Sequence, residues 1–358
     1  KSYQIIVFGT TFIKIDVFFV GNNIYLCYSK FNKPHTMEAN LSSQIKLDRT
    51  PKRYYRPDNA FELTALTRFE KVFTEIYESS EEGALQVARE VADLMRTREK
   101  EGRFCVLALG SGAGTHGVYR ELVRMHQNEG LSFSNTIIFN VSEFFPLEAD
   151  APGTSKLLHE VLIDLIDIDP QNVYTPDGTI AKESIFDFCK DYEKKIEKLG
   201  GLDLTLVEFG PSGNLAFNEP GSQINSSTRL MLLGSESRHN FAKLFHSNEA
   251  VPHSAITMGI STLLGAKKVI VVGWGETISP YVRQAIEAPA SDTVPASFLQ
   301  SHKESKFVLD LSSAEHLTRL STPWLVTSCE WDDKLIRRAI VWLCRITGKP
   351  ILKLTNKD

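Results

Sequence analysis

The sequence lacks the cysteine pattern that a disulfide framework or a structural zinc site would require. It has 5 cysteines in 358 residues, and none of them forms a C-x-x-C pair. They are Cys27, Cys105, Cys189, Cys329 and Cys344. The histidines show no H-E-x-x-H spacing, so no metal-binding motif is predicted. An odd number of scattered cysteines is typical of the reducing cytoplasm, and we therefore expect a cytoplasmic protein.

Long uncharged apolar runs are also missing. The most apolar stretch, from Ile5 to Tyr28, is interrupted by Lys14 and Asp16. It therefore does not provide the roughly 20 apolar residues of a transmembrane helix, and it lacks the pattern of a signal peptide. The net charge of −4 offers no basic footprint for nucleic acid or for an anionic membrane. We expect neither a nucleic-acid partner nor a membrane partner.

What the sequence does contain is a regular alternation of short apolar runs with helical patterns. Continuous apolar strands that alternate with helices indicate a parallel sheet covered on both faces. The predicted strands are Phe104–Leu109, Thr136–Asn140, Leu202–Phe209, Ala255–Met258, Lys268–Gly273, Lys306–Leu311 and Pro323–Val326, with Thr228–Leu232 as a further short candidate.

Three of these runs are followed by glycine-rich or polar segments. The first is followed by G-S-G-A-G-T at 110–115, the second by V-S-E-F at 141–144, and the third by S-G-N-L-A-F-N-E-P at 212–220. In an open α/β sheet, ligands bind at the carboxyl ends of the strands. The three segments therefore predict one shared site.

These segments resemble the motifs of the glucosamine-6-phosphate deaminase/isomerase family, in the family's order and spacing between about Tyr77 and Asp310. The family's phosphate loop reads T-G-[SG]-[ST]-P, against S-G-A-G-T at 111–115. Its base motif F-N-M-D-E-Y corresponds to F-N-V-S-E-F at 139–144, and its ring-opening motif D-G-H-I-A-F-N-E-P to the segment 212–220. The resemblance implies a three-layer α/β/α sandwich around a mostly parallel, modified Rossmann sheet. This is the fold of ribose-5-phosphate isomerase and glucosamine-6-phosphate deaminase.

Several catalytic side chains of the family are replaced in this chain. The resemblance places the carboxylate that moves the C2 proton at Ser142, and the carboxylate and histidine of ring opening at Ser212 and Asn214. Glu219 keeps the family's second ring-opening carboxylate, and the adjacent Glu143 is a candidate substitute base. Serine and asparagine side chains are not bases near neutral pH. The resemblance therefore implies amino-sugar phosphate metabolism, whereas the residues predict weak or absent turnover.

The predicted phosphate site is altered as well. The family's phosphate-binding arginine corresponds to Lys243, which keeps the charge but loses the bidentate fork, and its lysine corresponds to Ile278. Backbone amides of the glycine loop remain as anion donors. The predicted phosphate contacts of this loop are Ser111, Gly112, Ala113, Gly114 and Thr115. We expect a small-molecule sugar phosphate as the ligand and no cofactor.

Three functions stay open from the sequence. The first is a glucosamine-6-phosphate deaminase/isomerase, and the second is a non-catalytic, regulatory sugar-phosphate-binding domain. The third is a nucleotide-binding oxidoreductase, because residues 112–117 satisfy G-x-G-x-x-G between a strand and a helix. The acidic residue that binds ribose should follow about 20 residues later, but Glu143 lies 26 residues after Gly117.

The predicted domain organisation has three regions. Residues 1–36 precede the first methionine, Met37, and are interpreted as an upstream extension or a misassigned start. A β-rich N-terminal addition that packs on the domain is the alternative. Residues 37–318 form the deaminase-like domain, and residues 319–358 form a C-terminal extension that fits a chain leading into a second domain. The chain resembles the front half of bacterial proteins in which a sugar deacetylase-like domain follows, but it contains no His-Pro-Asp-Asp motif of such a domain. Family members form oligomers, so a homo-oligomer stays open.

Overall fold

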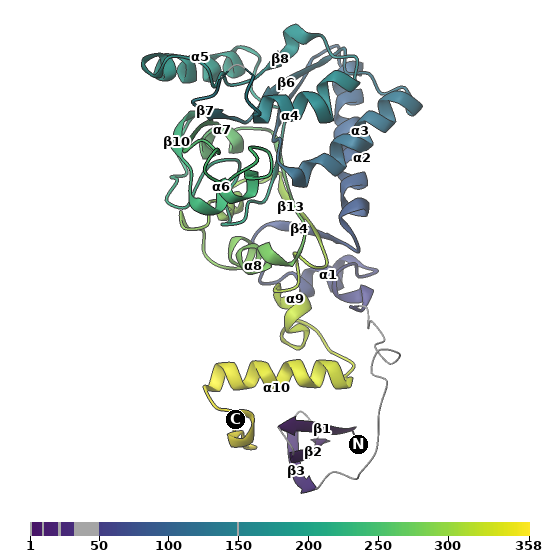
Figure 1. The fold of residues 1–358 in the computed structure, drawn as a ribbon. Helices are drawn as coiled ribbons and strands as arrows, with labels where there is room; N and C mark the ends of the chain where they lie inside the picture. Colours follow the sequence, from purple (N-terminus) through teal and green to yellow (C-terminus); the bar gives the residue numbers. More distant parts are fainter. Residues whose placement is uncertain (1, 9–10, 21–22, 32–49, 149) are drawn as a thin grey trace. The chain divides into compact units, whose positions relative to one another are not determined.

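The computed structural model describes residues 2–8, 11–20, 23–31, 50–148 and 150–358. The chain divides into two compact units, which can be followed by colour in Figure 1. Residues 67–317 form the larger unit, and residues 1–66 with 318–358 form the smaller one. The predicted domain of residues 37–318 stays a prediction: residues 50–66 belong to the smaller unit, and the predicted boundary after residue 36 lies outside the described residues.

The larger unit is built on a seven-stranded sheet with the strand order β4-β13-β12-β9-β5-β6-β8. All its strand pairings are parallel. Its central strands are apolar and buried on both faces, as a covered parallel sheet requires. In sheet order the strands are β4 (Phe73–Tyr77), β13 (Ser305–Asp310), β12 (Lys268–Gly273), β9 (Leu204–Glu208), β5 (Cys105–Leu109), β6 (Thr136–Asn140) and β8 (Val173–Tyr174).

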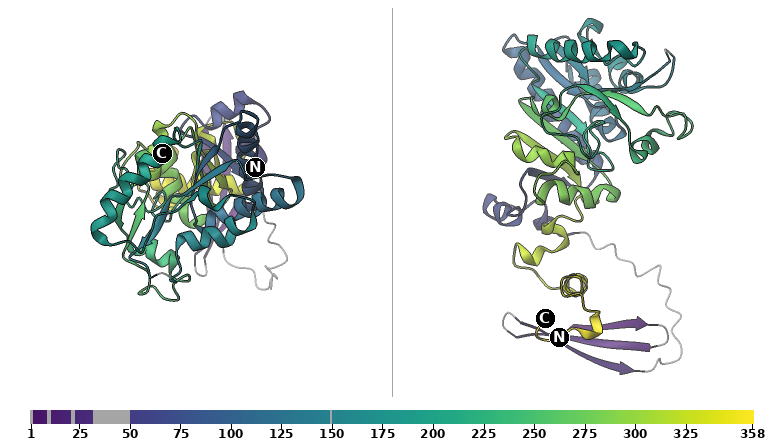
Figure 2. Two further views of the ribbon diagram at one scale, coloured as in Figure 1. Left: turned by 90° about the horizontal axis from the view of Figure 1, so that it is seen from above. Right: turned by 90° about the vertical axis from the view of Figure 1, so that its left-hand side faces the viewer.

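Helices cover both faces of this sheet, so the predicted three-layer α/β/α fold is confirmed (Figure 2). On one face, Val91 of helix α2 and Leu122 of helix α3 pack in one hydrophobic core with Leu107 and Ile270 of the sheet. The helices of the larger unit are α2 (Ser80–Lys100), α3 (His116–Glu129), α4 (Thr154–Val161), α5 (Ile185–Lys198), α6 (Ser235–Phe241), α7 (Ile260–Leu264) and α8 (Ser279–Glu287).

A second, antiparallel sheet supports the loops at the carboxyl ends of the main strands. Its order is β10 (Arg229–Leu232), β11 (Ser254–Thr257) and β7 (Ser142–Phe145). The ring of Phe144 packs against those of Phe217, Phe241 and Phe245, at centroid distances of 5.1, 5.1 and 5.0 Å. This aromatic cluster joins the strand that carries Ser142, the loop after β9 and helix α6. The short strand candidate at Thr228–Leu232 is confirmed as β10.

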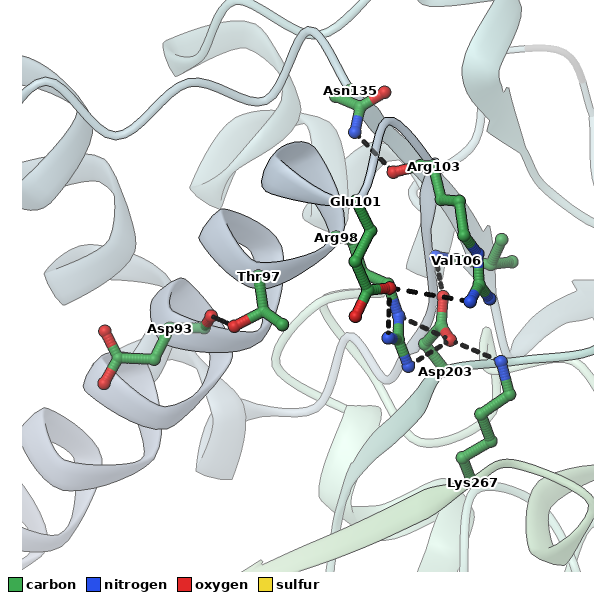
Figure 3. A network of polar contacts seen from close by, with 9 residues as sticks. All are labelled: Asp93, Thr97, Arg98, Glu101, Arg103, Val106, Asn135, Asp203 and Lys267. Atoms are coloured by element: carbon green, nitrogen blue, oxygen red, sulfur yellow. Dashed lines mark hydrogen bonds and ion pairs between the residues drawn. The ribbon is translucent and has the colours of Figure 1, made fainter.

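A buried carboxylate, Asp203, holds the amino ends of the main strands together (Figure 3). It accepts hydrogen bonds from the Arg98 Nε at 3.0 Å, the Lys267 Nζ at 2.8 Å and the Val106 N–H at 3.0 Å. Burial by itself would raise the pKa of Asp203, but Lys267, Val106 and Arg98 together outweigh it and lower that pKa. Because Asp203 directly precedes β9, this network lies at the amino ends of the strands, opposite to their carboxyl ends.

The smaller unit contains an antiparallel sheet of β1 (Ser2–Phe8), β2 (Thr11–Val20) and β3 (Asn23–Phe31). Its helices are α1 (Ala60–Leu66), α9 (Thr318–Ser321) and α10 (Asp333–Thr347). The predicted strand at Pro323–Val326 is wrong, since Pro323–Leu325 is a 3₁₀ helix. Proline has no N–H for a sheet ladder and suits the first turn of a helix. Among the described residues, no helix is both long and apolar enough to cross a bilayer.

Candidate functional site

Two adjoining cavities open at the carboxyl ends of neighbouring strands of the main sheet. The smaller, of about 40 Å³, lies between the loops after β5, β6 and β9, and the larger, of about 350 Å³, lies between the loops after β5, β9 and β12. Glu208, Gly210, Pro211 and Asn240 line both. Small-molecule sites usually occupy about 300–1,000 Å³, so the larger cavity has the size of a ligand site. The cavities lie where the sequence predicts that three strand ends converge.

The glycine loop after β5 forms one wall of both cavities. Ser111 and Gly112 line the smaller cavity, and Ala113 and Gly114 line the larger one. The Ser111 hydroxyl donates to the Asn140 side chain at 3.0 Å. Thr115 is fully buried, and its hydroxyl donates to the carbonyls of residues 110 and 112 rather than facing either cavity. Four of the five phosphate contacts predicted in this loop therefore lie at a cavity wall.

Strand β7, which follows β6 closely, places its two candidate residues on different sides. Ser142 lines the smaller cavity, whereas Glu143 does not. The Glu143 carboxylate accepts backbone N–H groups of Phe144, Thr154 and Ser155, each at 2.8 Å. Burial raises the pKa of Glu143, and these three N–H groups oppose that shift. The carboxylate thus satisfies the first amides of α4, as acidic groups at helix starts commonly do.

The loop after β9 folds its polar side chains onto itself. The Ser212 hydroxyl donates to Asn214 Oδ1 at 3.0 Å, and the Asn214 Nδ2 donates to the Ala216 carbonyl at 2.7 Å. Asn214 lines the smaller cavity, whereas Ser212 lines neither. Asn218 donates to the carbonyls of Leu215 and residue 258, at 3.0 and 2.8 Å. The amides of this segment therefore brace the loop.

The remaining predicted residues lie away from the cavity walls or differ in character from the family's. The Glu219 side chain is buried, and its Oε1 has no hydrogen-bond partner among the described residues. It lines neither cavity. Lys243 is exposed and lines neither cavity. Ile278 lines the larger one.

Sequence reasoning missed Glu208, the last residue of β9, which lines both cavities. Its Oε2 accepts the Gly114 N–H at 2.7 Å. Burial raises the pKa of Glu208, and this one hydrogen bond opposes the shift. The signal for it was a lone carboxylate at the end of an otherwise apolar strand.

Three more residues at the cavities had no motif to mark them. Ser237 and Asn240 come from α6, and Trp274 follows β12. The Trp274 indole N–H donates to the Gly114 carbonyl at 2.7 Å, so it fixes the glycine loop from the other side. Among the described residues that line the two cavities there is no lysine or arginine. No cluster of three or more potential metal ligands occurs in the described part of the chain.

Comparison with known proteins identifies relatives of this chain. It is 57% identical over 323 residues to a glucosamine-6-phosphate deaminase-like protein of Bacteroides thetaiotaomicron, a match that covers 90% of this chain and 49% of the relative. The chain thus spans about half the length of that relative. It is 35% identical over 233 residues to a glucosamine-6-phosphate deaminase of Shewanella loihica, covering 65% of this chain and 86% of the relative.

Solved structures and a family model agree with these matches. A monomeric glucosamine-6-phosphate deaminase of the NagB superfamily is similar with a TM-score of 0.65 and 31% identity, over 68% of this chain and 99% of that one. A 6-phosphogluconolactonase of Trypanosoma brucei shares the fold, with a TM-score of 0.56 and 19% identity, over 69% of this chain and 99% of its own. The model for glucosamine-6-phosphate isomerases/6-phosphogluconolactonase matches residues 78–308, so the chain belongs to this family.

Proposed function

We propose that this chain is a non-catalytic, sugar-binding member of its family that acts in amino-sugar metabolism. The observation that carries the proposal is the chemistry of the smaller cavity, where Ser142 and Asn214 stand at positions that the resemblance assigns to proton transfer. A hydroxyl and an amide donate and accept hydrogen bonds but do not act as general bases near neutral pH. Such groups are suited to hold sugar hydroxyls without reacting with them.

The carboxylates near these positions do not replace the missing base. Glu143 is turned toward the start of α4 and is engaged by three backbone N–H groups. Glu219 is buried away from both cavities. A general base has to reach the proton that it removes, and its loss typically slows a reaction by about 10²- to 10⁴-fold. We therefore infer turnover far below that of a deaminase.

The proposed site of action is the cytoplasm. Cys105 and Cys189 are buried, unpaired thiols. Burial raises the pKa of Cys105 to about 12 and that of Cys189 to about 11, so both stay protonated and unreactive. Unpaired thiols of this kind support a reducing compartment.

A second candidate function is catalysis with Glu208 as the base. Glu208 is the one carboxylate among the described residues that line the two cavities, and burial raises its pKa. A raised pKa in a cleft is a feature of many catalytic carboxylates. The names of the relatives favour this alternative, since several are glucosamine-6-phosphate deaminases.

Proton NMR of glucosamine 6-phosphate and of glucosamine with the full chain in D₂O tests both candidates. The proposal predicts that the C2 proton signal of each sugar persists and that saturation transfer from the protein reaches the bound sugar. Loss of the C2 signal in the wild-type protein, abolished by Glu208→Gln and retained in Glu276→Gln, would establish the second candidate. Glu276 is a suitable control because it is an exposed carboxylate that lines neither cavity.

A gain-of-function variant checks that the scaffold still presents a sugar correctly. Ser142→Asp, Ser212→Asp and Asn214→His together restore the side chains that the resemblance expects. Exchange of the C2 proton of glucosamine in this variant, with none in the wild type, is the expected result. Failure of saturation transfer for both sugars would refute the binding part of the proposal.

A further inference from the structure

The glycine loop of the candidate site already holds a carboxylate from its own chain. A Cβ built on Gly112 would lie 1.7 Å from the Glu208 Oε1, and one built on Gly114 would lie 2.8 Å from the Oε2. Real Cβ atoms do not approach other atoms within 3.0 Å. The two glycines are therefore the residues that let the Glu208 carboxylate lie directly against the loop, where it accepts the Gly114 N–H.

This arrangement gives the loop a different partner from the one that its sequence predicts. Glycine loops at the start of a helix bind anions because their N–H groups and the helix dipole favour negative charge. The loop here leads through a 3₁₀ turn, Ala113–Thr115, into the 14-residue helix α3. Glu208 supplies the negative charge that such a loop favours, so a phosphate group would have to displace it or lie beside it.

The surrounding charges do not offset a second anion. Among the described residues that line the two cavities, Glu208 is the one charged side chain. Lys243, at the family's arginine position, is exposed and lines neither cavity. Ile278, at the family's lysine position, presents an apolar side chain to the larger cavity. A phosphate beside Glu208 would therefore be repelled without a compensating cation.

The smaller cavity also contains a hydroxyl group that is free to form a hydrogen bond with a neutral ligand. The Ser237 hydroxyl is buried, with an exposed fraction of 3% for the residue, and has no partner among the described residues. Ser237 lines the smaller cavity together with Ser111 and Asn214. A buried hydroxyl without a partner is costly unless a ligand or water completes it.

We propose that Glu208 is the specificity-determining residue of the proposed sugar site, selecting an unphosphorylated sugar and excluding a phosphate group from the glycine loop. A carboxylate offers about four lone-pair positions, and the Gly114 N–H uses one of them. The others accept hydrogen bonds from sugar hydroxyls or from the ammonium group of a hexosamine. The ligand class is therefore a neutral or cationic sugar, such as glucosamine. This inference rests on the proposed function, since it specifies the ligand of the same site.

Calorimetric titration of the full chain with glucosamine, glucosamine 6-phosphate and inorganic phosphate tests this role. For the wild type we expect glucosamine to bind at least about tenfold more tightly than its 6-phosphate. Glu208→Ala vacates the loop, so inorganic phosphate and glucosamine 6-phosphate should each bind at least about tenfold more tightly than to the wild type. Glu208→Gln keeps the volume and removes the charge, and its phosphate affinity should lie between these two. The Glu208→Gln variant still tests the inference if the Glu208→Ala variant does not fold.

Glu276→Ala is the matched control, because it removes a negative charge near the larger cavity without changing the loop. Thr277, its neighbour, lines that cavity, whereas Glu276 is exposed. Equal gains in phosphate affinity from Glu276→Ala and Glu208→Ala would overturn the inference, as would a wild type that binds the 6-phosphate as tightly as glucosamine. If no protein binds either sugar, the proposed function fails. The inorganic phosphate titrations still report separately whether Glu208 blocks the loop.

Discussion

Replacing Gly112 by alanine tests whether the Glu208 carboxylate lies against the glycine loop. Gly112 has φ −70° and ψ 156°, an extended conformation that alanine adopts without strain. The three atoms that its Cβ would meet first are Oε1, Cδ and Oε2 of Glu208, at 1.7, 2.0 and 2.5 Å. The substitution should therefore act through Glu208 and not through the backbone, and the carboxylate has to leave the loop.

The expected magnitude follows from two opposing effects. Moving the carboxylate away from Gly114 breaks a hydrogen bond to a charged group, which contributes about 1.5–3 kcal/mol. Replacing glycine by alanine at a compatible conformation stabilises a protein by about 0.4–1 kcal/mol through the unfolded chain. Gly112→Ala should therefore reduce the free energy of unfolding by about 0.5–2.6 kcal/mol in the wild type. In a Glu208→Ala background the same change should be neutral or stabilising.

Native-state hydrogen exchange of the β5 and β9 amides is the appropriate assay, because it reports the unfolding of the larger unit alone. The four proteins of the double-mutant cycle should give a coupling energy of about 1.5–3 kcal/mol between the two sites. Gly130→Ala is the control: Gly130 has φ +67° with no atom within 4 Å of a built Cβ, so its cost should be the same in both backgrounds. A coupling energy below about 0.5 kcal/mol for Gly112 would show that the carboxylate does not lie against it.

Two further predictions concern pH and stability. Asp203→Asn should destabilise the larger unit by about 1.5–3 kcal/mol, since it weakens hydrogen bonds from Arg98 and Lys267 to a buried carboxylate. Because the pKa of Asp203 is lowered on folding, this difference should be constant above its ordinary pKa of 3.8 and shrink as the pH falls below it, as urea denaturation at several pH values will show. The raised pKa of Glu208 means that folding favours its protonated form over its charged form, so Glu208→Gln should gain stability relative to the wild type as the pH rises from 4.5 to about 8. Its advantage in melting temperature should decline as the pH falls toward the ordinary value of 4.5, and a constant advantage would contradict the burial argument.

The main sheet was predictable because its strands are buried on both faces. Runs such as Thr136–Asn140 and Lys268–Gly273 are apolar between their end residues, and their bounds in the structure are the predicted ones. The two-residue strand β8 and the edge strand β4 were missed, since short or half-exposed strands carry little periodic signal. Pro323–Val326 is apolar enough for a strand, but its proline begins a 3₁₀ turn instead.

The location of the site was predictable as well, but the direction of each side chain was not. Ser142 and Glu143 are consecutive, and the structure turns one toward the cavity and the other toward α4. The alternation of a strand predicts opposite faces for them, but not that the amides of α4 receive the carboxylate. The position of Glu208 depends on how β9 lies beside β5, which no local pattern encodes.

The glycine loop shows why a motif by itself does not specify the charge of a ligand. Glycines at positions 112 and 114 allow an anionic group to approach the backbone, and this holds for a bound phosphate and for an internal carboxylate alike. What distinguishes the two cases is the residue that ends the neighbouring strand β9, where a carboxylate reaches the loop from about 94 residues further along the chain. In this sheet the last residue of β9 lies beside the loop that follows its neighbour β5. The ligand specificity of such a site is therefore determined by the strand ends on both sides of the loop as much as by the loop itself.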